Sequence, residues 1–166
     1  HAQERWDEAT ARQFGLPVLV SAFTALHRAV YSNNAALAEL LLRRGADPDA
    51  RTNAEQTALH LAVLMDLLPL AALLLRHGAH PNCATALGIT PLHCAVMRDR
   101  ATLAELLLRH GADADRADAH GRTPRDWARH KGYAPVLAAL RAGTEQPSTS
   151  HNTLSTLENT LFHTTG

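Results

Sequence analysis

The sequence is poor in the features that point to a particular chemistry. It has only two cysteines, Cys83 and Cys94, which make neither a disulfide framework nor a set of zinc ligands. Its formal net charge is zero, so composition indicates no charged surface for nucleic acid or for an anionic membrane. The longest apolar run, from Leu59 to Leu75, is interrupted by Asp66 and Pro69 and is too short to span a bilayer.

Motifs of catalysis and of targeting are missing as well. The sequence contains no His-Glu-x-x-His, no Cys-x-x-Cys and no phosphate-cradling glycine loop. Ser, His and Asp are all present, but their spacing does not favour a triad. We therefore expect no catalytic residue, no metal site and no cofactor. No signal peptide is recognisable, so we expect an intracellular protein of the cytoplasm, the nucleus or both.

What the sequence does contain is one phrase repeated at a fixed interval. Thr-x-Leu-His-x-Ala-Val begins at Thr24, Thr57 and Thr90, a step of 33 residues, and a degraded copy begins at Thr123. A second phrase, Leu-Leu-Leu-Arg-x-Gly-Ala, follows each of the first three copies at the same distance. A repeat of this length indicates a solenoid of stacked helical units.

Each phrase has a local structural meaning. The threonine that opens the first phrase is a helix N-cap, and Pro91 and Pro124 follow it where a missing N–H costs nothing. The leucine triplet is the buried stripe of a second, antiparallel helix, which a glycine then ends with φ > 0. In the first repeat these helices are expected at about 25–32 and 36–43. Asn or Asp stands between the two helices of the first three repeats and tolerates the left-handed conformation needed there.

These phrases resemble the Thr-Pro-Leu-His-x-Ala and Leu-Leu-x-x-Gly-Ala stretches of the ankyrin repeat, over about residues 20–143. The resemblance implies an all-α ankyrin-repeat solenoid of helix-turn-helix units with projecting loops or β-turns. It also implies that His27, His60 and His93 are structural and hydrogen-bond between adjacent loops.

The chain divides into a cap, the repeats and a tail. Residues 1–20 are predicted to form a helix that covers the first repeat. Residues 21–143 hold the ankyrin repeats, at about 21–53, 54–86 and 87–119 with a capping repeat at 120–143. In that last repeat Asp126 replaces the histidine and Arg141 replaces a buried leucine, which indicates a face turned to water. Trp127, at a position that usually faces inward, is expected in the core of this cap.

Residues 144–166 form a Ser/Thr-rich linker and a short apolar motif. They contain no Ala, Lys or Arg, and their apolar residues recur at helical spacing. The members of that motif are Leu154, Leu157, Leu161 and Phe162. Two interpretations stay open: a disordered tail with a few apolar residues, or a docking motif that acts on another protein or on this solenoid. A fused partner peptide would also explain the change in composition.

The surface expected to bind is the concave groove of the solenoid, between the loops and the exposed side of the first helices. The outward positions are the seventh and eighth residues after each capping threonine. They are Tyr31, Ser32, Leu64, Met65, Met97, Arg98, His130 and Lys131. The middle of this strip is apolar, and methionine is common on surfaces that grip helices or extended peptides. The opposing interpretation is that these apolar side chains pack against the next repeat. The far end is basic and suits an acidic residue of a ligand.

We therefore expect a non-catalytic protein–protein interaction module that binds a peptide or helix of a partner protein, with the chain's own C-terminal tail as a further candidate. We expect no direct binding of nucleic acid or membrane. The resemblance also leaves open a substrate-recruiting ankyrin domain of a ubiquitin-ligase adaptor, although no SOCS box is recognisable. An ankyrin inhibitor of a transcription factor or of a kinase is equally compatible with the repeats.

Overall fold

A computed structural model of the protein describes residues 24–143. The predicted capping helix of residues 1–20 lies outside the described residues. So does the tail of residues 144–166, with the motif of Leu154, Leu157, Leu161 and Phe162.

Within 24–143 the chain forms helices and loops without a strand, so the predicted all-α solenoid is confirmed. The helices are α2 (Ala25–Tyr31), α3 (Ala35–Arg43), α4 (Ala58–Leu64), α5 (Leu68–Arg76), α6 (Pro91–Met97), α7 (Ala101–Arg109), α8 (Pro124–Lys131) and a last helix over residues 134–143. In the first repeat these bounds differ by only one residue from those predicted.

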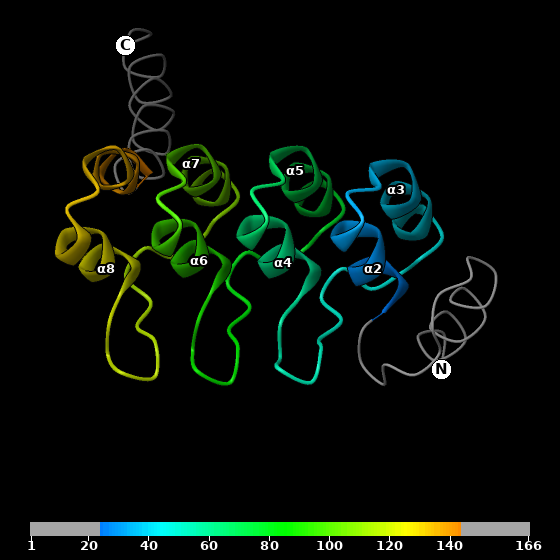
Figure 1. Ribbon diagram of the computed structural model, residues 1–166, viewed down its shortest axis with the longest axis horizontal. Helices are drawn as coiled ribbons and strands as arrows, with labels where there is room; N and C mark the ends of the chain where they lie inside the picture. Colours follow the sequence, from blue (N-terminus) through cyan, green and yellow to red (C-terminus); the bar gives the residue numbers. More distant parts are fainter. Residues whose placement is uncertain (1–23, 144–166) are drawn as a thin grey trace, which may run out of the picture.

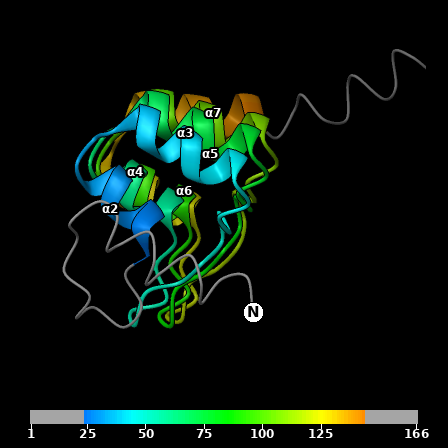
Figure 2. The ribbon, with the colours of Figure 1, turned by 90° about the vertical axis from the view of Figure 1, so that its right-hand side faces the viewer.

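The helices stand in two parallel layers. Helices α2, α4, α6 and α8 form one row, each in contact with the next, and α3, α5 and α7 form the other (Figure 1). Seen along the stack, the short turn that joins α2 to α3 lies on one side, while the long loops descend from the other side (Figure 2). We call α2, α4, α6 and α8 the inner helices and the long loops the fingers.

Each inner helix begins where its threonine predicts. The hydroxyl of Thr24 accepts a hydrogen bond from the His27 amide at 3.3 Å, and the hydroxyl of Thr123 accepts one from Asp126 at 3.1 Å. Thr57 and Thr90 cap α4 and α6 in the same way. The N-cap supplies an acceptor to a backbone N–H that has no partner inside the helix.

The turn between the two helices of each repeat uses the left-handed region. Asn33, Asp66 and Asp99 have φ values of 51°, 59° and 54°, and Gly132 has 70°. This confirms the prediction made from residue type, because Asn and Asp are the non-glycine residues that best tolerate this region. Four successive repeats therefore reverse direction with one backbone geometry, which keeps the inner helices in register.

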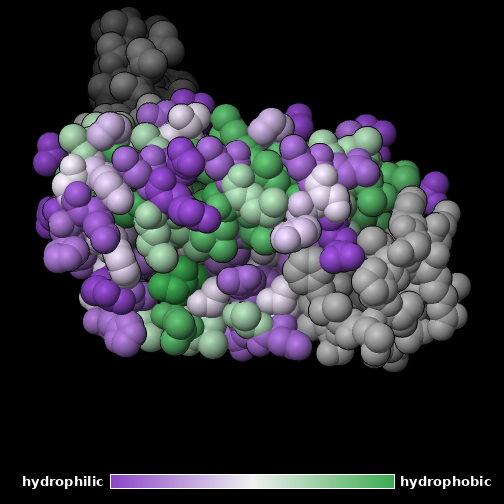
Figure 3. All heavy atoms as spheres, viewed as in Figure 1, coloured by the Kyte–Doolittle hydropathy of each residue, from purple (hydrophilic) through white to green (hydrophobic). Residues whose placement is uncertain are grey.

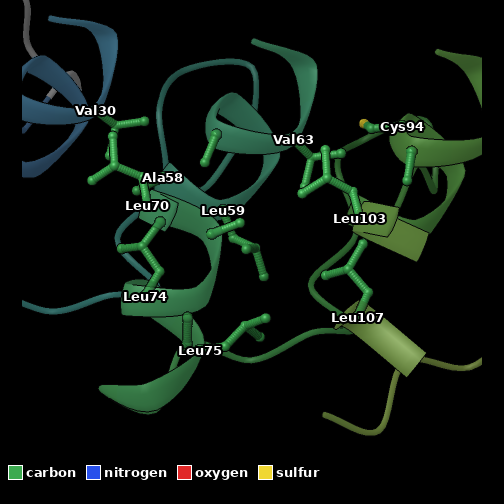
Figure 4. Close-up of a cluster of buried hydrophobic side chains, with 14 of the residues drawn as sticks. Val30, Ala58, Leu59, Val63, Leu70, Leu74, Leu75, Cys94, Leu103 and Leu107 are labelled. Atoms are coloured by element: carbon green, nitrogen blue, oxygen red, sulfur yellow. The ribbon is translucent and has the colours of Figure 1, made fainter. Parts of the chain in front are cut away.

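The core runs between the layers and continues from repeat to repeat. Leu70 and Leu74 of α5 and their equivalents Leu103 and Leu107 of α7 take up the same arrangement (Figure 4). In the inner layer Val30, Val63 and Val96 are fully buried. Each such valine is worth about 1.5–3 kcal/mol in removal of apolar surface from water.

The fourth repeat departs from this pattern at two positions. Arg129 stands where the others have the buried valine, and Arg141 stands where they have the third leucine of the triplet; both are exposed. Exposed arginines suit the outer side of a terminal repeat, and the assignment of this repeat as the cap stays a prediction.

Candidate functional site

The eight residues predicted to bind a partner lie at the same height on the four inner helices. Tyr31, Leu64 and Met97 are the last residues of α2, α4 and α6, and the residue after each is the C-cap. His130 and Lys131 end α8. Neighbouring packed helices are about 8–10 Å apart, so these positions form one row across the stack. We call it the inner row.

The apolar members of the inner row differ in exposure. Tyr31 is 58% exposed, Met65 37% and Met97 42%. Leu64 does not match this pattern, because it is only partly exposed and packs against the core. Its neighbour Met65, at the C-cap, is the residue that α4 presents to solvent. Apolar and hydrophilic surfaces alternate on the face seen in Figure 3, with apolar atoms gathered over the middle of the stack.

The polar members of the row are all exposed. They are Ser32, Arg98, His130 and Lys131. Arg98 is the C-cap of α6, and Lys131 is the last residue of α8, so both cationic side chains lie near the negative end of a helix dipole.

Buried histidines fix the spacing of the inner helices and the fingers. The imidazole Nε2 of His60 donates to the Ile89 carbonyl at 2.9 Å, because its Nδ1 already accepts from the Thr57 amide at 3.1 Å. His93 bonds likewise to the Arg122 carbonyl at 3.1 Å, and the Nε2 of His27 lies 3.1 Å from the Gln56 carbonyl. Each ring thus ties its inner helix to the start of the next repeat, as the resemblance implied.

The comparison with known families agrees with this geometry. The family described as "Ankyrin repeats (3 copies)" matches residues 12–85 and 69–149, which together make up most of the chain. This chain belongs to the ankyrin repeat family. Ankyrin repeats are generally protein–protein interaction modules and are typically non-catalytic. No curated protein matches the chain closely enough to add to this.

The fingers of this ankyrin stack are also joined to one another. The Asp49 carboxylate accepts from the His80 amide at 2.8 Å, and one repeat later Asn82 accepts from the Asp113 amide at 2.8 Å. Arg51 reaches forward to donate to the Ala84 carbonyl at 2.9 Å. These bonds between equivalent loops hold the fingers as a continuous wall beside the inner helices.

No buried group in this stack is set up as a nucleophile or base. Burial lowers the pKa of His60 to about 4 and also lowers the pKa values of His27 and His93, so all three rings stay neutral at pH 7. Burial raises the pKa of the Cys94 thiol to about 12, which keeps it protonated. Among residues 24–143 no group of His, Cys, Asp or Glu side chains has the arrangement of a metal site. No helix in that range has the length and apolar character to cross a membrane.

The sequence prediction missed the exposure of Trp127 on α8, beside the inner row. Trp127 was expected in the core, but it is only partly buried and packs at the edge of the apolar cluster. Its indole N–H donates to Asp118 at 3.3 Å, and the Arg122 guanidinium lies 4.3 Å from the centre of its ring. Such a contact combines cation–π attraction with stacking. The signal was the spacing: Trp127 precedes Lys131 by four residues and so shares its helix face.

Asp118 anchors this arrangement. Its buried carboxylate accepts from the backbone amides of His120 at 2.8 Å and Arg122 at 3.0 Å, and from the Trp127 indole. Burial alone would raise its pKa, but these hydrogen bonds and the Arg122 guanidinium together lower the pKa to about 2. Asp118 therefore stays ionised and holds Arg122 over the tryptophan.

Proposed function

We propose that this ankyrin stack binds a peptide or helix of a partner protein along its inner row. The observation that carries the proposal is that three consecutive inner helices each expose an apolar side chain at their C-terminal end: Tyr31 and Met97 as the last helix residue, and Met65 as the C-cap. The residues one position before Tyr31 and Met97, Val30 and Val96, are fully buried, so each of these two exposed side chains stands next to a residue fixed in the core. Aligned exposed apolar residues are typical of interaction sites.

The dimensions of the row suit a segment of protein. From α2 to α8 there are three helix-to-helix steps of about 8–10 Å, or about 25–30 Å in all. At about 1.5 Å per residue a helix of some 17–20 residues covers that length, and an extended strand covers it with about eight residues. The row is supported by short helices, and the three seven-residue ones, α2, α4 and α6, are each tied to the next repeat by a histidine bond. A ligand would therefore meet a preorganised surface.

The test uses peptides rather than an unknown partner. A random 16-residue phage-displayed library is selected on the intact chain, and enriched peptides are titrated against the isotope-labelled protein by NMR. We expect the amide shifts of Met65 and Met97 to move first. Met97→Asp should weaken binding about tenfold or more, because it places a charge in an apolar contact.

Leu40→Asp is the matched control. Leu40 lies on α3 in the other helix layer and is 41% exposed, which is close to the 42% of Met97. Both variants are first checked for cooperative thermal unfolding. The inner row is not the binding surface if both variants lose binding equally, or if the amide shifts are confined to the layer of α3, α5 and α7.

A further inference from the structure

We call the side of the inner helices that carries the inner row the inner face, and its chemistry changes from one end of the stack to the other. Each inner helix turns three positions toward this face, at spacings of three and four residues. From α2 to α8 they hold Arg28, Tyr31 and Ser32; Leu61, Leu64 and Met65; Cys94, Met97 and Arg98; and Trp127, His130 and Lys131. Cys94 is buried, and the other eleven side chains are at least partly exposed. None of these twelve positions is acidic, although the whole chain has as many acidic residues as basic ones.

The apolar and the basic residues of this face are separated along the stack. All three positions of α4 are apolar, whereas the fourth-repeat end combines Lys131 and Trp127 with Arg98 from the neighbouring helix. Arg98 and Lys131 occupy equivalent positions on packed helices, about 8–10 Å apart. Within the described part of the chain, neither makes an ion pair with a carboxylate.

The acidic residues near this end are engaged elsewhere. Asp118 is buried under Arg122 and Trp127, and Asp126 accepts from the Thr123 amide at 3.1 Å. Asp66 lies 3.4 Å from Arg100, in the turn between α4 and α5. Asp99 follows Arg98 directly in the turn between α6 and α7, and its carboxylate is exposed. The fourth-repeat end therefore has an excess of positive charge next to an aromatic ring.

We infer that the partner segment is an acidic–apolar one, with apolar side chains over Met65 and Met97 and one or more carboxylates over Arg98 and Lys131. This inference rests on the proposed function and adds the chemistry and direction of its ligand. An acidic residue at that end gains charge-assisted hydrogen bonds, and a basic one meets like charge. Trp127 and Arg122 are of the residue types enriched at binding hot spots, and they provide a flat contact beside the charged pair.

The experiment reverses the charge at this end. Peptides selected from the random 16-residue library are sequenced, and the tightest are measured against Arg98→Glu/Lys131→Glu at 50 and 500 mM salt. We expect an excess of Asp and Glu on one side of the apolar residues, and about tenfold or greater weakening in the variant at low salt. The difference should shrink at high salt, since exposed charges are screened.

Arg76→Glu/Arg109→Glu is the matched control. It makes the same change of net charge, also at the C-terminal ends of helices, but on α5 and α7 in the other layer. The affinity of this control variant for the selected peptides should stay within about twofold of that of the parent protein. A new selection on Arg98→Glu/Lys131→Glu should also yield peptides without the acidic excess.

The outcomes separate the two proposals. If peptides bind, Met97→Asp abolishes binding, and Arg98→Glu/Lys131→Glu has no effect, then the acidic preference is wrong and the proposed function stands. If no peptide is enriched, or Met97→Asp binds as well as the parent, both are wrong. If a fluorescent single-stranded oligonucleotide competes with the peptides at similar affinity, the basic end selects anionic polymers in general and the inference of an acidic peptide is overturned.

Discussion

The three buried histidines make the stability of this protein depend on pH in a way that can be worked out from the structure. His27, His60 and His93 are each buried, and burial lowers the pKa of each ring below its ordinary value of about 6.5. In His60 and His93 the Nδ1 atom accepts a backbone N–H, so a proton there would break that bond. The folded state consequently excludes protons that the unfolded state takes up.

The free energy of unfolding should therefore decrease as the pH falls. Above pH 6.5 both states hold neutral rings and the full stability is present. Between pH 6.5 and about 4 the unfolded chain is protonated and the folded His60 is not, so stability falls as the pH falls. Below about pH 4 both states bind the proton and this contribution stops changing. For His60 alone, the total loss is about 3 kcal/mol at 1.36 kcal/mol per unit of pKa.

The three rings act in the same direction. His60 alone contributes an uptake of up to about one proton on unfolding between pH 6.5 and about 4, or about 1.4 kcal/mol per pH unit, and His27 and His93 add to this slope. Asp118 acts in a separate window: its pKa of about 2 adds stability above pH 4 that is lost as the pH falls from about 4 to 2.

The assay is urea unfolding at half-unit steps from pH 7.5 to 5.0. His60→Gln should be less stable at pH 7.5 and should show a slope smaller by about one proton. Val63→Ala is the control, since it removes about 2 kcal/mol of packing from the same helix without a titrating group, and its slope should equal that of the parent. The slope of the free energy of unfolding against pH gives the number of protons taken up on unfolding. If the parent takes up less than one proton, or if His60→Gln leaves the slope unchanged, the folded rings accept protons and the reasoning is wrong.

Three further predictions concern the fingers and the anchor of Trp127. Gly88→Ala should lower the free energy of unfolding in urea by at least about 2 kcal/mol, and Gly121→Ala by only about 1 kcal/mol. The two glycines have similar φ values, 74° and 75°, but a Cβ at Gly88 would stand 2.8 Å from the Ala119 amide nitrogen, whereas one at Gly121 would meet no atom. Glu55→Gly should stabilise by about 1 kcal/mol, because Glu55 holds a φ of 58° where the next two fingers have glycine; a loss of stability would contradict this. Asp118→Asn should cost about 2 kcal/mol in the same assay and change tryptophan fluorescence, because its amide N–H₂ would face the Trp127 indole and Arg122 as a third donor. Unaltered stability and emission would show that Asp118 does not hold Trp127.

The scaffold could be predicted from sequence because each repeat must satisfy the same local requirements. A capping threonine, a histidine that reaches the next repeat and an Asn or Asp with positive φ each act within one repeat or between equivalent positions. Periodicity and residue type were therefore enough to assign the threonine caps and the turns, whereas the histidine bond was implied by the resemblance to ankyrin repeats. The bounds of α2 and α3 followed from the same signals to within one residue.

The binding surface was less predictable because it depends on residues that do not recur. Leu64 turned out to pack on the core while Met65 is exposed, and the helix pattern alone does not distinguish two successive residues at a helix end. The contact of Arg122 with Trp127 depends on Asp118, which precedes the tryptophan by nine residues in a finger. Such contacts follow from three-dimensional proximity, and one sequence gives no direct sign of it.

The same division leaves few residues free to determine which partner the proposed surface would bind. In α4 five of seven residues are buried in the stack, Leu61 and Leu64 are partly exposed, and the C-cap Met65 is exposed. A substitution at Met65 or Met97 changes the inner face without touching the histidine bonds, whereas one at His60 removes a bond to the next repeat and one at Val63 removes packing from the core. Binding and stability should therefore respond to different residues in this chain. The exception is the fourth repeat, where Asp118 holds Trp127, a residue that packs on the core and also belongs to the surface proposed to face the partner.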